Sequence, residues 1–247
     1  MVVLAGQGIL ARTSGGRVNA HLARIGRMYA AWRVKRDLDG LHVAGVDELR
    51  AQLDAGPLLV AANHVGWWDG MAALALGHAI GAEVALVARA ETLQANPWMA
   101  TVGVLPLHGG LGLRASARRV GEFLDRPNRM VWFFPQGRQR PESVRPLGFQ
   151  PGIAAFARAT GVPVVPAALA YPFRELEVPA AALAFGRRTP AEPAALEAAV
   201  LDRLAAIHRW ADGAANPDDL PFLPVLAPRR TPQQAGIGAR LLTQVTR

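Results

Sequence analysis

The sequence predicts a single α/β domain with a mostly parallel mixed sheet flanked by helices. Three observations lead to this prediction. Short apolar runs bounded by Gly, Pro or Asn alternate with helical patterns through the middle of the chain. These runs are apolar at consecutive positions, as expected of strands that are buried on both faces. A chain of 247 residues with 51% hydrophobic content is also long enough to bury the core of such a sheet.

The elements follow in order along the central part of the chain. Strands are expected at 58–62, 84–88, 102–107, 130–134, 162–169 and 181–185. Helical patterns lie between them at 71–80, 114–124 and 153–159, and a longer one follows at 193–210. We interpret residues 41–210 as the α/β domain, preceded by a segment over 1–40 and followed by an extension over 211–247.

The segment 1–40 is predicted to hold a basic amphipathic helix over 17–36. Apolar residues recur at steps of four and three, which places on one face Val18, Leu22, Ile25, Tyr29 and Trp32. Basic residues surround that face: Arg24, Arg27, Arg33, Lys35 and Arg36. Two interpretations remain open. The helix packs on the domain through this face, or it lies in a lipid interface with its arginines toward the headgroups, and the two are compatible at different positions along the helix.

The composition changes after Trp210. Residues 212–232 are rich in Pro, Ala and Asp and show little periodicity, which predicts an extended tail that wraps the domain or stays loose. A short helix is expected at 235–245. No run approaches the 20 or so apolar residues of a membrane span, since the longest candidate, 70–82, ends at a glutamate.

Charge and cysteine content limit the function classes. The formal net charge is +8, and Lys35 is the single lysine. This excess of base suits an anionic partner such as membrane phospholipid, nucleic acid or an acidic cofactor. The absence of cysteine excludes disulfides, thiolate metal sites and cysteine nucleophiles. It also fits a reducing compartment.

The strongest local motif is Asn63-His64-Val65-Gly66-Trp67-Trp68-Asp69. It follows a predicted strand and precedes a predicted helix, at the position where open α/β sheets place their sites. Histidine is the usual general base near neutral pH, and a carboxylate five residues on can accept its other ring N–H. The alternative is that Asp69 merely caps the following helix and that His64 is an ordinary loop histidine.

A second motif, Phe133-Phe134-Pro135-Gln136-Gly137-Arg138-Gln139-Arg140, ends another predicted strand. Its turn at Gly137 exposes backbone N–H groups that could hold a carbonyl oxyanion. The neighbouring arginines could bind a phosphate. The alternative is an ordinary strand-ending turn with solvated arginines.

Together these segments resemble the glycerolipid acyltransferase family, whose best-known members acylate lysophosphatidic acid. That family carries His-x4-Asp, Gly-x-[Ile/Val]-x-x-x-Arg, Phe-Pro-Glu-Gly-Thr-Arg and a Val-Pro-[Ile/Val]-Val-Pro strand, in this order. We align these motifs with His64 to Asp69, Gly103 to His108, Phe134 to Gln139, and Val162 to Pro166. The resemblance covers about 41–210, and the ordered set is far more specific than any one motif.

The resemblance implies a reaction and a set of roles. His64 is the general base, Asp69 orients it, and the Gly137 turn holds the oxyanion, with Asn63, Pro135 and Gln136 supporting these motifs. The acyl donor is carried on coenzyme A or on acyl carrier protein, and the acceptor is a lipid hydroxyl. No acyl-enzyme, metal or other cofactor is implied.

Three positions depart from the family pattern. His108 stands where we place the family's arginine, Gln136 replaces a glutamate, and Arg138 replaces a threonine. The family's arginines are associated with the phosphate of the acceptor. A lysophospholipid such as lysophosphatidic acid is therefore expected if Arg138, Arg140 or His108 binds that phosphate. A non-phosphorylated glycolipid or glycosylated terpenoid is the alternative.

The expected partners are the acyl donor, the lipid acceptor and an anionic membrane surface, with no nucleic acid. We expect a cytoplasmic protein, peripheral on the inner face of the membrane. A basic module that only binds lipid or nucleic acid would explain the charge equally well, but not a His and an Asp after a buried strand. A dinucleotide-binding enzyme matches only through Gly110-Leu111-Gly112, without the acidic residue that should follow, and no serine lies in a Gly-x-Ser-x-Gly turn.

Overall fold

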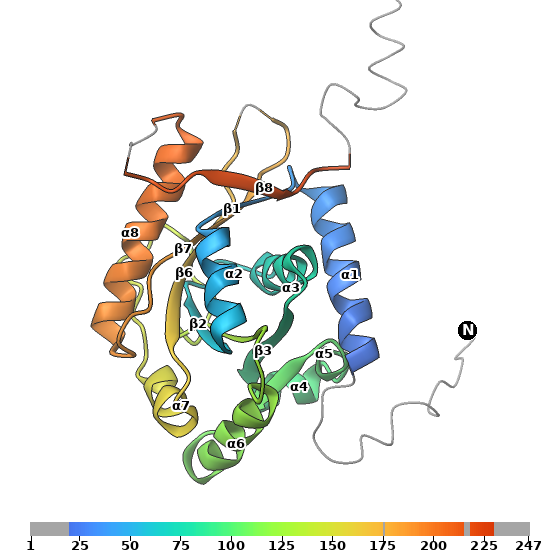
Figure 1. The fold of residues 1–247 in the computed structure, drawn as a ribbon, viewed down its shortest axis with the longest axis vertical. Helices are drawn as coiled ribbons and strands as arrows, with labels where there is room; N and C mark the ends of the chain where they lie inside the picture. Colours follow the sequence, from blue (N-terminus) through green and yellow to red (C-terminus); the bar gives the residue numbers. More distant parts are fainter. Residues whose placement is uncertain (1–19, 175, 215–217, 230–247) are drawn as a thin grey trace, which may run out of the picture.

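The computed structural model describes residues 20–174, 176–214 and 218–229. They form one eight-stranded sheet with helices on both faces, in the strand order β4-β3-β5-β2-β6-β7-β1-β8 (Figure 1). Two separate clusters of buried apolar side chains lie on the two sides of the sheet. The predicted α/β fold with a mostly parallel mixed sheet is therefore confirmed.

Five adjacent strands of the sheet are mutually parallel. In sheet order they are β4 (Val104–Leu107), β3 (Glu83–Arg89), β5 (Arg129–Phe133), β2 (Leu58–Ala62) and β6 (Val164–Ala170). The other strands introduce two antiparallel pairs: β7 (Ala181–Phe185) against β6, and β1 (Leu41–Ala44) against β8 (Phe222–Leu226). The carboxyl ends of the five parallel strands consequently meet at one edge of the sheet, which positions the site.

Three helices pack on each face. One face is covered by α1 (Ala20–Asp37), α2 (Val46–Ala55) and α3 (Trp68–Ile80). The other is covered by α6 (Leu113–Phe123), α7 (Gly152–Thr160) and α8 (Pro193–Ala211). Two short helices, α4 (Ala90–Ala95) and α5 (Trp98–Thr101), link β3 to β4, and a single 3-10 turn, η1 (Gly110–Gly112), precedes α6. Every residue of β2 is buried, because alternate side chains enter the two cores.

The predicted elements agree closely with the observed ones. All six predicted strands are present with ends within two residues, and 58–62 and 181–185 match at both ends. The sequence did not predict β1, α2, α4, α5 or β8. The tail over 212–232 contributes β8, which lies along β1, so this part of it wraps the domain. The helix expected at 235–245 and positions 17–19 lie outside the described residues, and the division at 40 and 210 stays a prediction.

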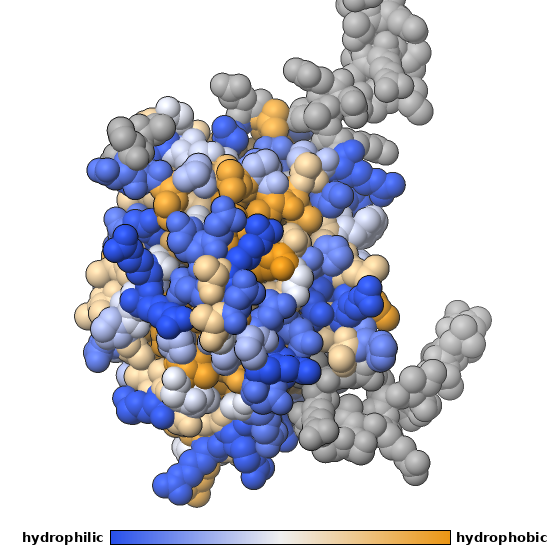
Figure 2. Space-filling view, in the orientation of Figure 1, coloured by the Kyte–Doolittle hydropathy of each residue, from blue (hydrophilic) through white to orange (hydrophobic). Residues whose placement is uncertain are grey.

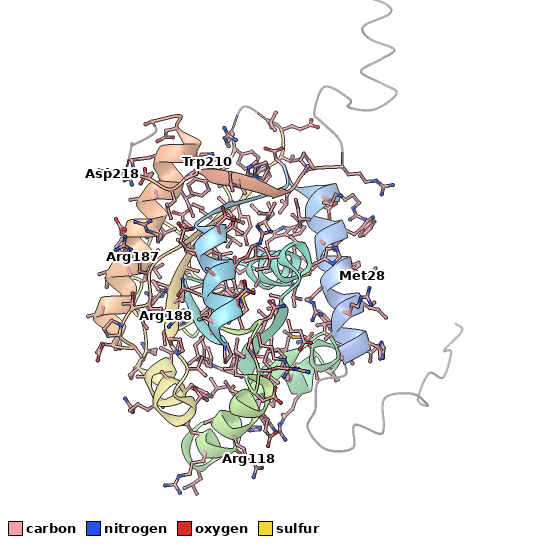
Figure 3. All side chains as sticks on the ribbon, in the orientation of Figure 1. Met28, Arg118, Arg187, Arg188, Trp210 and Asp218 are labelled. Carbon is pink, nitrogen blue, oxygen red and sulfur yellow. The ribbon has the colours of Figure 1, made fainter. Side chains whose placement is uncertain are left out.

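Helix α1 packs on the domain, but not through the face that we predicted. The buried side is made of small residues and one valine: Ala23, Gly26, Ala30, Ala31 and Val34. The bulky apolar side faces solvent instead, with substantial exposure of Leu22, Ile25, Met28, Tyr29 and Trp32. Figure 3 places Met28 on the outer side of α1. The interpretation that the Leu22–Trp32 face is buried against the core is therefore wrong.

The small residues of α1 allow it to approach α3 and the residue that follows α5 closely. A Cβ atom added at Gly26 would lie 2.8 Å from the Val102 side chain, and one added at Gly77 on α3 would lie 3.3 Å from the Arg27 side chain of α1. Close packing between α1 and its neighbours thus depends on glycine and alanine, and the larger apolar residues of α1 lie on the surface. Figure 1 shows α1 beside α3, at the opposite side of the molecule from α8.

The face of the molecule seen in Figure 2 is dominated by hydrophilic side chains, with apolar patches between them. No helix within the described residues is long and apolar enough to cross a bilayer.

Candidate active site

Chemically capable side chains gather at the carboxyl edge of the five parallel strands. His64 follows β2, Arg89 ends β3, His108 follows β4, Gln136 follows β5, and Tyr171 follows β6. Because these strands are neighbours and run in the same direction, these five residues share one edge of the sheet although they span more than a hundred positions of sequence.

His64 and Asp69 form the centre of this group. The Asp69 carboxylate oxygen Oδ2 lies 2.6 Å from the Nδ1 atom of His64. Asp69 is fully buried, whereas 22% of the His64 side chain is exposed. With Nδ1 donating to Asp69, the Nε2 lone pair is left free, and Nε2 has no hydrogen-bond partner among the described residues. This is the arrangement of a general base held by a carboxylate.

The Asp69 carboxylate organises the whole loop before α3. Its Oδ2 also accepts the backbone N–H groups of Val65 and Gly66, at 2.6 and 3.0 Å. Its Oδ1 accepts the hydroxyl of Tyr171 at 2.8 Å. Helix α3 begins at Trp68, and the residue before it makes no side-chain cap. Asp69 therefore binds the loop and the imidazole, and the alternative that it only caps the helix is wrong.

The segment around Gln136, which is third in the family order of motifs, supports His64 directly. The backbone N–H of His64 donates to the side-chain oxygen of buried Gln136 at 2.5 Å, and the His64 carbonyl accepts the backbone N–H of Arg140 at 2.9 Å. The Phe134 ring stacks on the imidazole, with 4.4 Å between ring centroids. Gln136 thus makes, with an amide oxygen, the contact that a carboxylate would make, and Phe134 packs against one face of the imidazole.

Asn63 and Tyr171 connect the catalytic loop to β6. The Asn63 side chain is buried and exchanges two hydrogen bonds of 2.8 Å with the backbone of Leu169. This contact ties the end of β2 to β6 two residues before Tyr171. Burial, together with the neighbouring Asp69 charge and hydrogen bond, raises the pKa of Tyr171 well above its usual value. Tyr171 therefore keeps its proton and acts as the donor to Asp69.

The turn at Gly137 has a left-handed backbone, with φ of +67°. Its own N–H donates to the Phe134 carbonyl at 2.9 Å, which closes the turn after Pro135 and Gln136. An oxyanion at this turn would have to share that N–H or use another donor. The oxyanion role of Gly137 stays a prediction.

A comparison with protein-family models decides the family. The family model described as Acyltransferase matches residues 40–170, which is more than half of the chain and includes His64, Asp69 and the Gln136 turn. The chain belongs to the acyltransferase family. A comparison with curated proteins finds no match.

The basic side chains around the acyltransferase site differ in whether they are free to bind a phosphate. Arg138 is exposed. Arg140 is engaged, because its guanidinium donates to the carbonyls of Pro146 and Leu147 at 3.2 Å. His108 is exposed beside η1, and its backbone N–H donates to Ser116. Counted from Gly103, the family's arginine position falls on Gly109 and not on His108, so our alignment of His108 with that arginine was one residue short.

Two residues of the acyltransferase site were missed from the sequence. Arg89 ends β3, and one of its guanidinium nitrogens would lie 3.5 Å from a Cβ atom at Gly137, so it reaches the turn of the third motif. A basic residue closing a predicted strand was the available signal. Tyr171 gave a comparable signal, since it follows a predicted strand. Within the described residues, no group of three or more His, Asp or Glu side chains is placed to hold a metal ion.

Proposed function

We propose that this acyltransferase moves a fatty acyl group from a thioester of coenzyme A or acyl carrier protein to a hydroxyl of a lipid acceptor. The observation that carries the proposal is the 2.6 Å contact between His64 Nδ1 and Asp69, which leaves Nε2 without a hydrogen-bond partner among the described residues on a partly exposed side chain. A base with that geometry can activate a hydroxyl without a covalent enzyme intermediate.

The proposed reaction has two proton transfers. His64 Nε2 takes the proton of the acceptor hydroxyl as its oxygen attacks the thioester carbonyl, and the carbonyl oxygen becomes an oxyanion. The carbon–sulfur bond then breaks, the carbonyl re-forms as an ester, and the imidazolium returns its proton to the thiolate that leaves. Asp69 stabilises the imidazolium between these steps, because its buried charge lies against Nδ1.

The acceptor that we propose is a lysophospholipid such as lysophosphatidic acid. Two arginines at the carboxyl edge support this choice, Arg89 beside Gly137 and Arg138 within the same turn. Neither forms an ion pair within the described residues, so both guanidinium groups are available to a phosphate. Arg140 is a weaker candidate than the sequence indicated, since it already holds the carbonyls of the 146–147 segment.

One observation favours the alternative, a non-phosphorylated acceptor such as a glycolipid or a glycosylated terpenoid. The end of the second motif presents His108 and Gly109 in place of an arginine, and His108 lacks the bidentate fork that suits a phosphate. A neutral acceptor would need only the general base and a site for the acyl donor, without a group that binds phosphate.

We further propose that the protein works on the inner face of an anionic membrane, in the cytoplasm, and does not bind nucleic acid. The exposed apolar side of α1 carries two aromatic residues, Tyr29 and Trp32, of the kind enriched at lipid–water interfaces. Arg36 lies over the Trp32 ring at 4.3 Å, so a cation borders the apolar side as it would near headgroups.

The same surface reaches the catalytic loop. The Arg33 guanidinium lies 5.4 Å from the Trp67 ring and 5.3 Å from the Trp68 ring, and it donates to Tyr29. Trp67 belongs to the His64–Asp69 loop and is half exposed. A membrane bound to α1 would therefore lie close to the entrance of the site, which suits an acceptor that stays in the bilayer.

The proposal is tested by incubating the purified protein with acyl-CoA or acyl carrier protein thioesters and a panel of acceptors, with the products read by mass spectrometry. The panel contains lysophosphatidic acid, other lysophospholipids and neutral glycolipids. We expect an ester in the wild type that is absent with His64→Ala. An ester on the neutral acceptors alone would replace the lysophospholipid proposal, and no ester with any pair would contradict acyl transfer to lipids.

A further inference from the structure

Tyr171 reaches the catalytic pair from outside the four family motifs. The two oxygens of the Asp69 carboxylate have different partners. Oδ2 accepts three hydrogen bonds, from the Nδ1–H of His64 and from the backbone of Val65 and Gly66. Oδ1 accepts the Tyr171 hydroxyl, which is its only partner among the residues that the structure describes. The Tyr171 hydroxyl is thus the hydrogen-bond donor for one of the two oxygens of a fully buried carboxylate.

That single bond has a chemical consequence. A buried carboxylate oxygen without a donor favours uptake of a proton, because the charge is no longer compensated. The His64–Asp69 pair would then hold a proton more tightly, either on Oδ1 of Asp69 or on the imidazole beside a less compensated carboxylate. In both cases a smaller fraction of the pair is unprotonated near neutral pH, so less of it is free to accept the proton of a hydroxyl.

The fold holds Tyr171 rigidly enough for this role. It is the first residue after β6, and the two Asn63 bonds to Leu169 fix the distance between the ends of β2 and β6. Its hydroxyl is separated from Asp69 by 102 positions in sequence, so the contact exists only because these strands are neighbours.

We propose that Tyr171 is a positioning residue that keeps the Asp69 carboxylate ionised and turned toward His64, and so keeps His64 ready to accept a proton. The inference rests on the proposed function, since it assigns Tyr171 a part in general-base catalysis. Tyr171 contacts Asp69 and not the reacting atoms, so its effect reaches the reaction through the carboxylate.

The test is the pair of variants Tyr171→Phe and Thr160→Val. The first removes the hydroxyl from Asp69. The second removes the hydroxyl of Thr160 on α7, which donates to the Phe156 carbonyl at 2.8 Å and does not touch Asp69. Tyr171→Phe should lower kcat at pH 7 by about ten-fold while KM stays within about two-fold, because a hydrogen bond to a charged group is lost without loss of a surface that binds substrate.

The pH profile separates a positioning role from a packing role. Tyr171→Phe should move the acid limb of kcat/KM to higher pH by roughly half a unit or more, so the loss is largest at low pH. Thr160→Val should leave that limb unmoved. The charged groups beside the His64–Asp69 loop and the Gly137 turn are Arg33 from α1, Arg89 from β3 and Arg140 after β5, and neither variant removes a contact of any of them.

A second readout does not depend on substrate. The six histidines are followed by NMR as the pH is lowered, and the signal of His64 is assigned by its loss in His64→Ala. In Tyr171→Phe the midpoint of the His64 titration should move to higher pH, in the same direction as the acid limb. If that midpoint moves but the wild type transfers no acyl group, the coupling stands and the proposed function fails.

The inference is overturned if transfer occurs and both the acid limb and the His64 midpoint are unchanged in Tyr171→Phe. Thermal unfolding of each variant guards against misfolding. A further variant, Tyr171→Leu, removes the ring as well as the hydroxyl. If Tyr171→Phe behaves as the wild type and only Tyr171→Leu loses activity, Tyr171 contributes packing and not a hydrogen bond, which also overturns the inference.

Discussion

Gln136 accepts the backbone N–H of His64 through its side-chain oxygen at 2.5 Å, across 72 positions of sequence. This contact joins the third motif to the first and holds the catalytic loop against the end of β5. Because the acceptor is an oxygen in either residue, glutamine can stand here where the family has glutamate. The supporting contact is therefore kept although the charge is lost.

Substitution of Gln136 should separate the contact from the charge. Gln136→Leu leaves the His64 N–H without its acceptor in a buried place, and we expect it to lower the free energy of unfolding by about 1–3 kcal/mol and kcat by ten-fold or more. Gln136→Glu keeps an acceptor oxygen and should retain most of the activity. Urea unfolding and initial rates measure both, and equal rates for Leu and Gln at 136 would show that the contact does not support catalysis.

Recognition of the acceptor's phosphate should depend on Arg89 and Arg138. We expect Arg89→Ala and Arg138→Ala each to lower kcat/KM for lysophosphatidic acid by about ten-fold and to leave a neutral acceptor nearly unaffected, because a charge-assisted hydrogen bond is lost only with the phosphate. Arg140→Ala is the control. It should lower stability, since the carbonyls of Pro146 and Leu147 lose their donor. Unchanged kinetics in both Ala variants would favour the neutral acceptor.

The exposed side of α1 should control membrane binding. The double variant Ile25→Ser with Met28→Ser should weaken sedimentation with phosphatidylglycerol vesicles by about ten-fold, because two apolar side chains no longer enter the lipid. Turnover of a short-chain soluble acceptor should be unchanged, since neither residue is buried. The matched control is Val144→Ser with Leu223→Ser, two exposed apolar residues that lie in the loop after β5 and on β8. Equal losses of binding in both double variants would contradict a role for α1.

His42 should make stability depend on pH. Burial lowers its pKa. The residue lies on β1, the strand that pairs with β8, and its ring is 5.0 Å from the Trp210 ring. The unfolded chain binds a proton at this histidine near pH 6.5 while the folded protein does not, so stability falls as the pH drops below that value. Asp37 has a lowered pKa and acts in a separate window, below about pH 4.

Urea unfolding at pH 7.5 and 5.5 measures this effect. The decrease in the free energy of unfolding between the two pH values should be smaller in His42→Gln than in the wild type. His78→Gln, which changes an exposed histidine of α3, should show the full decrease. The assignment to His42 fails if both variants lose the same amount as the wild type.

The parts of the fold that could be read from the sequence are those encoded locally. β2 and β7 are unbroken apolar runs, and a strand buried on both faces leaves that pattern. β8 contains Pro224 and reads as coil, yet a proline is tolerated in a strand at the edge of a sheet, and β8 gains its structure by pairing with a strand 180 residues earlier.

The face of α1 was misassigned for a physical reason. Periodicity assigns the largest apolar residues to the core, but close contact with α3 requires small ones, so Gly26 and Ala30 are buried while Trp32 is exposed. The site shows the same limit. His64 and Asp69 were found because they lie five residues apart, whereas the Tyr171 contact depends on the order of strands in the sheet, which the sequence does not state.

The central claim is that His64 is the general base of an acyl transfer. It is tested most directly by the kcat of His64→Ala with the best donor and acceptor from the panel, beside wild type of matching thermal stability. General-base catalysis typically contributes 10²–10⁴-fold, so we expect kcat to fall by at least about a hundred-fold with the fold intact. A variant that keeps more than about a tenth of the wild-type kcat would contradict the account.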